Sequence, residues 1–181
     1  MPGPSREARN LEAEDAESLS LQIERLERER DYAIENEDYA TAARLRDQLK
    51  VMQEDHVAAV VAANKLFYRC FQQGDAKGMA RIWAKGDHIG VVHPGANLIS
   101  GRDDVMASWD LILESFRTVR VVIDLENIQV HVNGRTALVN CIEVMSGDRV
   151  GGRVVATNLF EWHDGRWLMI LHHGSGAAIS F

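Results

Sequence analysis

The C-terminal third of the chain consists of four long segments rich in apolar residues, separated by short turns. Two turns, Asn133-Gly134 and Asp164-Gly165, suit two-residue hairpin loops, which require a positive φ angle. A third, Ser146-Gly147-Asp148, is a looser turn of the same kind. The pattern predicts four strands joined in sequence by these turns, at residues 119–132, 135–145, 150–163 and 166–174.

The two middle strands carry apolar residues on both faces. On strand 135–145 the two alternating sets are Ala137, Val139 and Cys141 on one face and Leu138, Ile142 and Val144 on the other. One face would fill the core, and the other would form an exposed apolar patch in a monomer. We therefore expect a homodimer that forms through this sheet.

The residues before the strands have the periodicity of helices. No Gly or Pro interrupts residues 6–73, and apolar residues recur there at helical spacing. Asp38 is a good N-cap, and the pair Gly74-Asp75 would end one helix and begin the next. The expected helices span 38–73, 76–83 and 102–116, and short strands are expected at 88–94 and 97–100.

A further helix, at 18–36, is followed by the helix-breaking run Asn36-Glu37-Asp38, so that the two helices form an αα-hairpin. Residues 1–17 contain two prolines and a glycine and few apolar residues, and we expect them to be disordered. The expected organisation is therefore a hairpin at 18–55 and one main domain at 56–181.

The negative charge is confined to the N-terminal part. Of the 27 acidic and 20 basic residues, 15 and 8 fall within residues 1–55, so that 56–181 is neutral and the first part carries the whole net charge of −7. Such an arm is a poor ligand for nucleic acid, since phosphate contacts need a basic face. It suits a protein partner with basic patches.

Composition excludes several other classes. No apolar run approaches the roughly 18–20 residues that span a bilayer, and the N-terminus has no signal-peptide core. The two cysteines, Cys70 and Cys141, form no disulfide framework and suggest free thiols in a reducing compartment. We expect a cytoplasmic protein, or an organellar one if a presequence has been removed.

The hairpin resembles the UVR motif. The residues that carry the likeness are Ile23-Glu-Arg-Leu26, Ala33, Glu35-Asn-Glu-Asp-Tyr39, Ala42-Ala43-Arg44-Leu45-Arg46-Asp47 and Leu49. In that family the hairpin is a protein–protein docking module that often pairs with another copy of itself. The resemblance implies partner-docking roles for Leu26, Tyr39, Ala42, Ala43, Arg46, Asp47 and Leu49. The small Ala42 and Ala43 would let the two helices approach closely.

Residues 57–176 resemble the SnoaL-like branch of the NTF2-like superfamily. The matching segments are Phe67-Tyr68…Phe71-x-x-Gly74-Asp75, Trp83-Ala84, Val92-His-Pro-Gly95, Gly101-Arg102…Ser108-Trp109, Ala156-Thr-Asn158 and Trp167-Leu…His172-His173-x-Ser175. The resemblance implies an α+β fold in which three helices and a strongly curved, mainly antiparallel sheet form a cone with an internal cavity. The same scaffold hosts steroid isomerases, polyketide cyclases and members without chemistry, so the fold alone does not select a function.

Several residues could line the expected cavity: Phe67, Tyr68, Trp83, His93, Trp109, Asn140, Asn158 and His173. In the isomerase branch a carboxylate directly before a proline is the general base, and this chain has His93-Pro94 there. Imidazole is also a competent base near neutral pH. The position of the isomerase's oxyanion-binding tyrosine falls on Phe67, which has no hydroxyl; Tyr68 is one residue away, and Glu143 is a possible second donor. Alternatively, His93 is a structural residue at the cavity rim.

Strand alternation sends His172 and His173 to opposite faces of the last strand, and we expect His173 to point inward. Asn140 and Asn158 interrupt apolar runs and would bond each other or a histidine, or else line a small ligand pocket. A zinc site built on His93 lacks a clear third ligand, so neither a metal nor a cofactor is expected.

The leading functional hypothesis is an adaptor or assembly factor, with a main domain that dimerises and a hairpin that docks a protein partner. The alternative is a small-molecule enzyme or carrier of the steroid isomerase or polyketide cyclase type, which uses the cavity, a hydrophobic ligand and His93 as base. A DNA-repair accessory is a weaker reading, suggested only by the name of the hairpin family.

Overall fold

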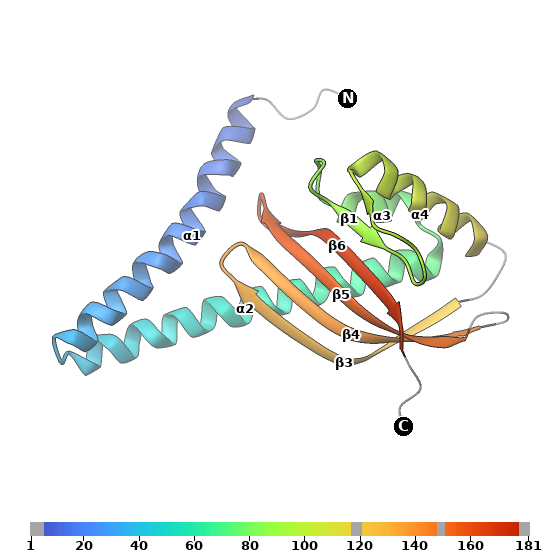
Figure 1. The fold of residues 1–181 in the computed structure, drawn as a ribbon. Coiled ribbons are helices and arrows are strands. Elements are labelled where there is room, and N and C mark those ends of the chain that lie inside the picture. The colour runs from blue at the N-terminus through green and yellow to red at the C-terminus, as the bar shows by residue number, and fades with distance from the viewer. Residues whose placement is uncertain (1–5, 117–120, 148–150, 178–181) are drawn as a thin grey trace.

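A single long helix runs through the molecule and joins its two parts. The computed structural model describes residues 6–116, 121–147 and 151–177. Helix α2 (Tyr39–Gln73) is continuous, as expected, and its 35 residues extend roughly 50 Å. Its N-terminal half pairs with α1 (Arg6–Glu35), and its C-terminal half lies along the sheet (Figure 1).

The capping residues define where the helices begin and end. The Asp38 carboxylate accepts a hydrogen bond from the Thr41 amide at 3.1 Å, and Gly74 ends α2 in the left-handed conformation with φ 63°. Asp75 then caps α3 (Ala76–Ile82) by accepting from the Gly78 amide at 2.8 Å. Only a residue without Cβ adopts the Gly74 conformation at no cost, which explains the abrupt stop after a 35-residue helix.

The N-terminus differs from the expectation. Residues 6–17, expected to be disordered, form the first turns of α1. This segment is rich in Ala, Glu, Arg and Leu, which have high helix propensity, and the prolines and glycine that suggested disorder all precede Arg6. The remaining part of that prediction, residues 1–5, lies outside the described residues.

Six strands form one sheet with the order β2-β1-β6-β5-β4-β3. The strands are β1 (Gly90–Val92), β2 (Ile99–Ser100), β3 (Val121–Asn133), β4 (Thr136–Gly147), β5 (Gly152–His163) and β6 (Arg166–Gly176). All neighbours are antiparallel except β1 and β6, which confirms the mainly antiparallel sheet. The expected strand residues 119, 120 and 150 and the turn residue Asp148 lie outside the described residues.

The hairpin turns agree with the expectation, with one change of register. Asp164 and Gly165 both have positive φ angles, 46° and 79°, and form the two-residue loop between β5 and β6. Between β3 and β4 the loop is Gly134-Arg135, because Asn133 pairs with Thr136 in the ladder. Gly134 still supplies the positive φ angle, 55°.

Two interruptions of the strand register accompany the curvature of the sheet. One lies between Glu126 and Gln129 of β3, where Asn127 has a φ of 53°, and the other lies opposite Leu159 and Phe160, where β6 has the extra residue Ile170. Bulges of this kind bend a strand and increase its twist. The concave face holds the core against α2, α3 and α4 (Arg102–Phe116).

Arg102 at the start of α4 joins two helices. Its guanidinium donates hydrogen bonds to the carbonyl oxygens of Ala80, Trp83 and Ala84, at 2.7, 3.1 and 2.6 Å. Those carbonyl groups lie at the end of α3, where no further helical turn can satisfy them. Arg102, which belongs to one of the segments that resemble the SnoaL-like branch, therefore has a structural role in this domain.

Candidate functional site

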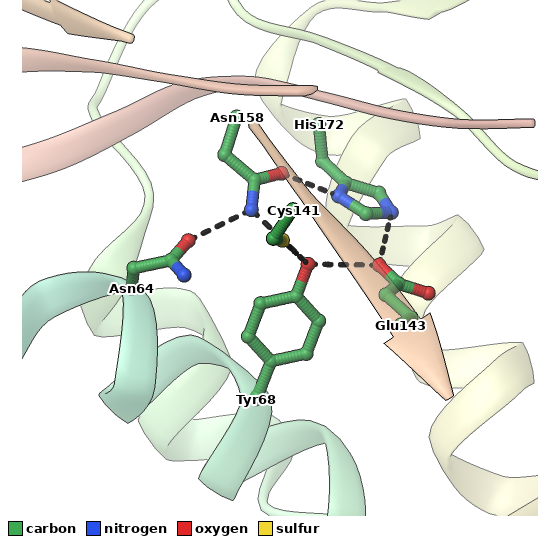
Figure 2. A network of polar contacts seen from close by, with 6 residues as sticks. All are labelled: Asn64, Tyr68, Cys141, Glu143, Asn158 and His172. Atoms are coloured by element: carbon green, nitrogen blue, oxygen red, sulfur yellow. Dashed lines mark hydrogen bonds and ion pairs between the residues drawn. The ribbon is translucent and has the colours of Figure 1, made fainter. Parts of the chain in front are cut away.

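A buried cluster of polar side chains lies between α2 and the concave face of the sheet. Its members are Asn64 and Tyr68 from α2, Cys141 and Glu143 from β4, Asn158 from β5 and His172 from β6 (Figure 2). Asn64 and Tyr68 are one helical turn apart and therefore share a face of α2. The strand residues come from three adjacent strands, so the curved sheet brings them against that face.

Asn158 is the centre of this cluster. Its Nδ2 donates to Asn64 Oδ1 at 2.8 Å and to the Tyr68 hydroxyl at 3.2 Å, and its Oδ1 lies 2.7 Å from His172 Nδ1. Because Oδ1 can only accept, His172 must carry its proton on Nδ1. One amide therefore orients three side chains.

The Tyr68 hydroxyl continues the network to β4. It donates to Glu143 Oε1 at 2.8 Å and lies 3.5 Å from Cys141 Sγ. Glu143 Oε1 is in turn 4.0 Å from His172 Nε2, which closes a ring of contacts. The Tyr68–Glu143 distance of 2.8 Å is that of an ordinary O–H···O hydrogen bond.

Burial controls the protonation of the cluster. It raises the pKa of the Glu143 carboxyl to about 7, although the hydrogen bond from Tyr68 opposes this shift. It lowers the pKa of His172 to about 3, with smaller contributions from His93 and His173. At neutral pH His172 is therefore neutral, and its 4.0 Å contact with Glu143 is not a salt bridge. Glu143 exchanges its proton close to neutral pH.

The cluster is enclosed by the core. Asn64, Tyr68, Glu143, Asn158 and His172 are each at most 2% exposed. The rings of Phe67 and Trp109 lie over His172, with centroids 5.1 and 5.7 Å from its ring. A ligand that reached the cluster would have to displace aromatic side chains.

Most of the residues expected to line a cavity do come together here. Phe67, Tyr68, Trp83, Trp109 and Asn158 are all buried on the concave side of the sheet. The sequence also pointed to Glu143 as a possible donor, but it gave no role to Asn64 or Cys141. Asn64 lies in the apolar stripe of α2 about one turn before Tyr68. A polar residue in such a stripe indicates a buried hydrogen-bond network.

The prediction that His173 points inward is wrong. His172 is the buried residue of the pair, and His173 is exposed. Strict alternation from Met169 would place His173 on the concave face, but the extra residue Ile170 changes the alternation along β6. Beyond this bulge His172 pairs with the buried Asn158, and His173 pairs with Thr157 on the opposite face.

Asn140 also lies outside the cluster. It pairs with Thr157, whose hydroxyl donates to Asn140 Oδ1 at 2.9 Å, on the convex face of the sheet. Asn158 pairs with Val139 on the concave face, so the two asparagines cannot bond each other. Of the two partners expected for Asn158, the histidine is the one observed.

His93 occupies the rim, between β1 and α4. Its Nε2 is 3.1 Å from the Ser108 hydroxyl, which itself donates to the Val105 carbonyl at 2.8 Å. Its ring meets the edge of Trp109 at a centroid distance of 4.9 Å. Burial lowers the pKa of His93, so the ring is neutral at pH 7 and could accept a proton there.

An apolar groove is present on the outside of the domain. It lies between α2, α3 and the β5–β6 hairpin and has a volume of about 540 Å³. Its walls include Ala59, Ala63 and Leu66 of α2 and Trp167 of β6. None of the residues expected to line the internal cavity contributes to it.

In the α1–α2 hairpin the residues of the docking motif have two different environments. Ala42, Leu45 and Leu49 are buried against α1, and Leu26 and Ala43 are half-buried. Tyr39, Arg46 and Asp47 are exposed, and Arg46 pairs with its neighbour Asp47 at 2.7 Å. The first group holds the hairpin together, and the second is accessible to a partner.

No helix within residues 6–116 combines the length and apolar character needed to cross a membrane.

Comparison with known proteins assigns both parts of the chain. The model of the SnoaL-like domain matches residues 60–180, and that of the UvrB/uvrC motif matches residues 20–55. A curated relative, the F-box protein SKIP8 of Arabidopsis thaliana, is 28% identical over 117 residues. That match covers 65% of this chain and 49% of the relative, so the chain spans about half the length of this protein.

Solved structures of the same fold include a candidate dehydratase of the NTF2-like family from Streptomyces avermitilis. It is 31% identical, with a TM-score of 0.65, and the alignment covers 70% of this chain and 99% of that one. A candidate calcium/calmodulin-dependent protein kinase type II association domain from Thiobacillus denitrificans is 26% identical, with a TM-score of 0.58 and coverage of 65% and 94%.

The curved sheet covered by helices agrees with the SnoaL-like match, and the α1–α2 hairpin agrees with the UvrB/uvrC match. The chain belongs to the SnoaL-like domain family, within the NTF2-like proteins, and it carries a UvrB/uvrC motif before that domain.

Proposed function

We propose that this protein is an adaptor or assembly factor, in which the α1–α2 hairpin docks a protein partner and the SnoaL-like domain forms a homodimer. The proposal rests on the location of the exposed apolar side chains. Five of the ten large apolar side chains that are exposed among the described residues lie between Leu21 and Val51: Leu21, Tyr32, Ile34, Tyr39 and Val51. Inside the domain, by contrast, Tyr68, Asn158 and His172 are each at most 2% exposed.

The charge of the arm indicates the chemistry of its partner. Residues 1–55 hold the whole net charge of −7, and the exposed Asp47 and Tyr39 lie on the hairpin. A surface of aromatic and acidic groups suits a protein with basic and apolar patches. It does not suit a nucleic acid backbone.

The docking role is tested by replacing the exposed tyrosines of the full chain. The Tyr32→Ser, Tyr39→Ser variant should lose most of the proteins recovered on the wild-type chain, because exposed aromatic groups contribute strongly to interfaces. Its free energy of unfolding should change by less than about 1 kcal/mol, since neither ring is buried. Leu111→Ser, which removes an exposed side chain of α4, is the matched control and should retain every partner. Equal recovery on all three chains would exclude the hairpin as the docking site.

The second part of the proposal concerns the convex face of the sheet. Leu138, Ile142, Val144, Leu159 and Leu171 are half-buried there, and Val155 is 45% exposed. These side chains form two apolar rows across the sheet, Leu138–Leu159–Leu171 and Ile142–Val155, separated by the polar row Asn140–Thr157–His173. A second copy of the same face would cover both apolar rows in a two-fold arrangement. The Thiobacillus relative, named for an association domain, is consistent with assembly through this fold.

Introducing a charge at the centre of this surface should separate the dimer. We expect the wild-type chain to sediment as a dimer at micromolar concentration and Ile142→Lys to sediment as a monomer, because a buried unpaired ammonium is costly. Leu111→Lys places the same charge on α4, away from the sheet, and should remain dimeric. A wild-type chain that sediments as a monomer would contradict the proposal.

A second candidate function is a small-molecule enzyme of the steroid isomerase or polyketide cyclase type, with His93 as general base. It is favoured by the pairing of the Tyr68 hydroxyl with Glu143, which places two hydrogen-bond donors together when the carboxyl is protonated. The indole N–H groups of Trp83 and Trp109 are also buried without a hydrogen-bond partner among the described residues. A small carbonyl compound that raises the melting temperature would support this function.

A further inference from the structure

Three potential metal ligands meet at the end of β5, outside the buried cluster. Glu161 and His163 are two residues apart on this strand and therefore point to the same side of it. His88 belongs to the turn that precedes β1. Because β6 lies between β1 and β5, the sheet brings that turn to the same end as the last residues of β5.

The contacts between these side chains converge on one oxygen atom. Glu161 Oε2 is 2.6 Å from His163 Nε2 and 3.5 Å from His88 Nε2. All three ligand atoms lie within 4.8 Å of one another. Tetrahedral zinc with ligands at about 2.0–2.2 Å holds neighbouring ligand atoms roughly 3.3–3.5 Å apart. Small side-chain rotations would therefore convert the observed arrangement into a ligand set.

The environment permits such rotations. The side chain of His88 is 49% exposed, and those of Glu161 and His163 are 31% and 32% exposed. The backbone of β5 is held on both sides, by β4 and β6, so the strand can supply two ligands from a rigid frame. The open side leaves room for water in a fourth position.

We propose that His88, Glu161 and His163 form a binding site for a divalent cation of the zinc class. Two imidazole nitrogens and one carboxylate oxygen are the donor set of zinc sites that keep one position for water. Magnesium and calcium ions prefer all-oxygen ligand sets, so this site should bind them poorly. The sequence suggested no metal site, because His88 is far from the other two residues along the chain and only the sheet brings the three together.

Other potential zinc-binding groups of the chain provide controls. Cys70 and Cys141 are buried and do not compete. His131 on β3 is exposed and lies outside the group of three. The His131→Gln variant therefore measures weak surface binding by a lone imidazole, with the same change of side chain as in His88→Gln and His163→Gln.

The test measures Zn²⁺ binding to the full chain by competition with a chromogenic chelator, and Co²⁺ binding by its visible absorption. We expect one ion per chain, a higher melting temperature with Zn²⁺, and no competition from Mg²⁺. His88→Gln and His163→Gln should each weaken binding at least about 10-fold, since the loss of even an outer-shell partner costs 10–100-fold. His131→Gln should bind like the wild type.

Two results would overturn the proposal: no saturable binding of Zn²⁺ by the wild-type chain, or affinities that His88→Gln and His163→Gln leave unchanged. The melting temperatures of the metal-free variants show whether each chain is folded, because all three replaced side chains are exposed or half-buried. Should one of them unfold, Glu161→Gln takes its place, since the amide keeps the volume of the carboxylate and makes a far poorer ligand.

Discussion

Asn158→Ala should lower the free energy of unfolding by about 3–5 kcal/mol. The replacement removes the donor to Asn64 and the acceptor for the His172 Nδ1–H, and both partners are at most 2% exposed. A buried polar group left without its hydrogen bond costs about 1–3 kcal/mol. The cavity left by the amide adds to this cost. Urea denaturation monitored by circular dichroism measures the change.

Asn140→Ala is the matched control. Asn140 lies on the adjacent strand but on the convex face, is half-buried, and accepts one hydrogen bond from Thr157. Its replacement should cost no more than about 1 kcal/mol, the usual net value of one hydrogen bond. If the two alanine variants lost the same stability, Asn158 would not be the centre of the buried network.

Glu143→Gln should become more stable relative to the wild type as the pH rises from 5 to 8. Burial raises the pKa of Glu143 to about 7 in the folded chain, from 4.5 in the unfolded chain. Between these values the folded chain binds the proton more tightly, so the wild type loses stability with rising pH. The loss is complete above pH 7 and amounts to about 3 kcal/mol. Glutamine cannot ionise and escapes this loss.

The difference between the two chains isolates the contribution of Glu143. His172 has its pKa lowered to about 3, so it destabilises the folded chain as the pH falls below 6.5. It is present in both chains, and its effect largely cancels. Glu126→Gln removes an exposed carboxylate that pairs with Arg153, and a surface pair of this kind contributes little at any pH. A Glu143→Gln difference that stays constant from pH 5 to 8 would show that Glu143 is ionised throughout this range.

Local chemistry along the chain predicted most of the helices. The absence of Gly and Pro up to Gln73 indicated that the second hairpin helix continues into the main domain. Asp38 and Gly74 marked the two ends of this helix, and Asp75 marked the start of the next one. These are interactions within a few residues, so the sequence contains all the information that they require. Residues 6–17, for which disorder was expected, lie within α1 in the structure.

The buried network could be predicted only in part. Asn158 stood out as a polar residue in an apolar run, and Tyr68 and Glu143 as possible donors near the oxyanion position that the resemblance implies. Nothing in the sequence states which strand residue faces which helix residue. The contacts Asn158–Asn64 and Tyr68–Glu143 join residues 94 and 75 positions apart. Such pairs depend on how the whole sheet curves over α2.

Alternation along the strands was determined by the sequence, whereas the position of the bulges was decided by the tertiary structure. The two-residue period separated Ala137 and Val139 from Leu138 correctly, because β4 pairs regularly with β5. On β6 the same rule placed His173 inside, and one extra residue, Ile170, reversed the result. A bulge costs ladder hydrogen bonds locally and is retained where the curvature it allows improves packing elsewhere. That balance involves the strands and helices together, and so the identity of the buried histidine follows from the fold and not from the local sequence.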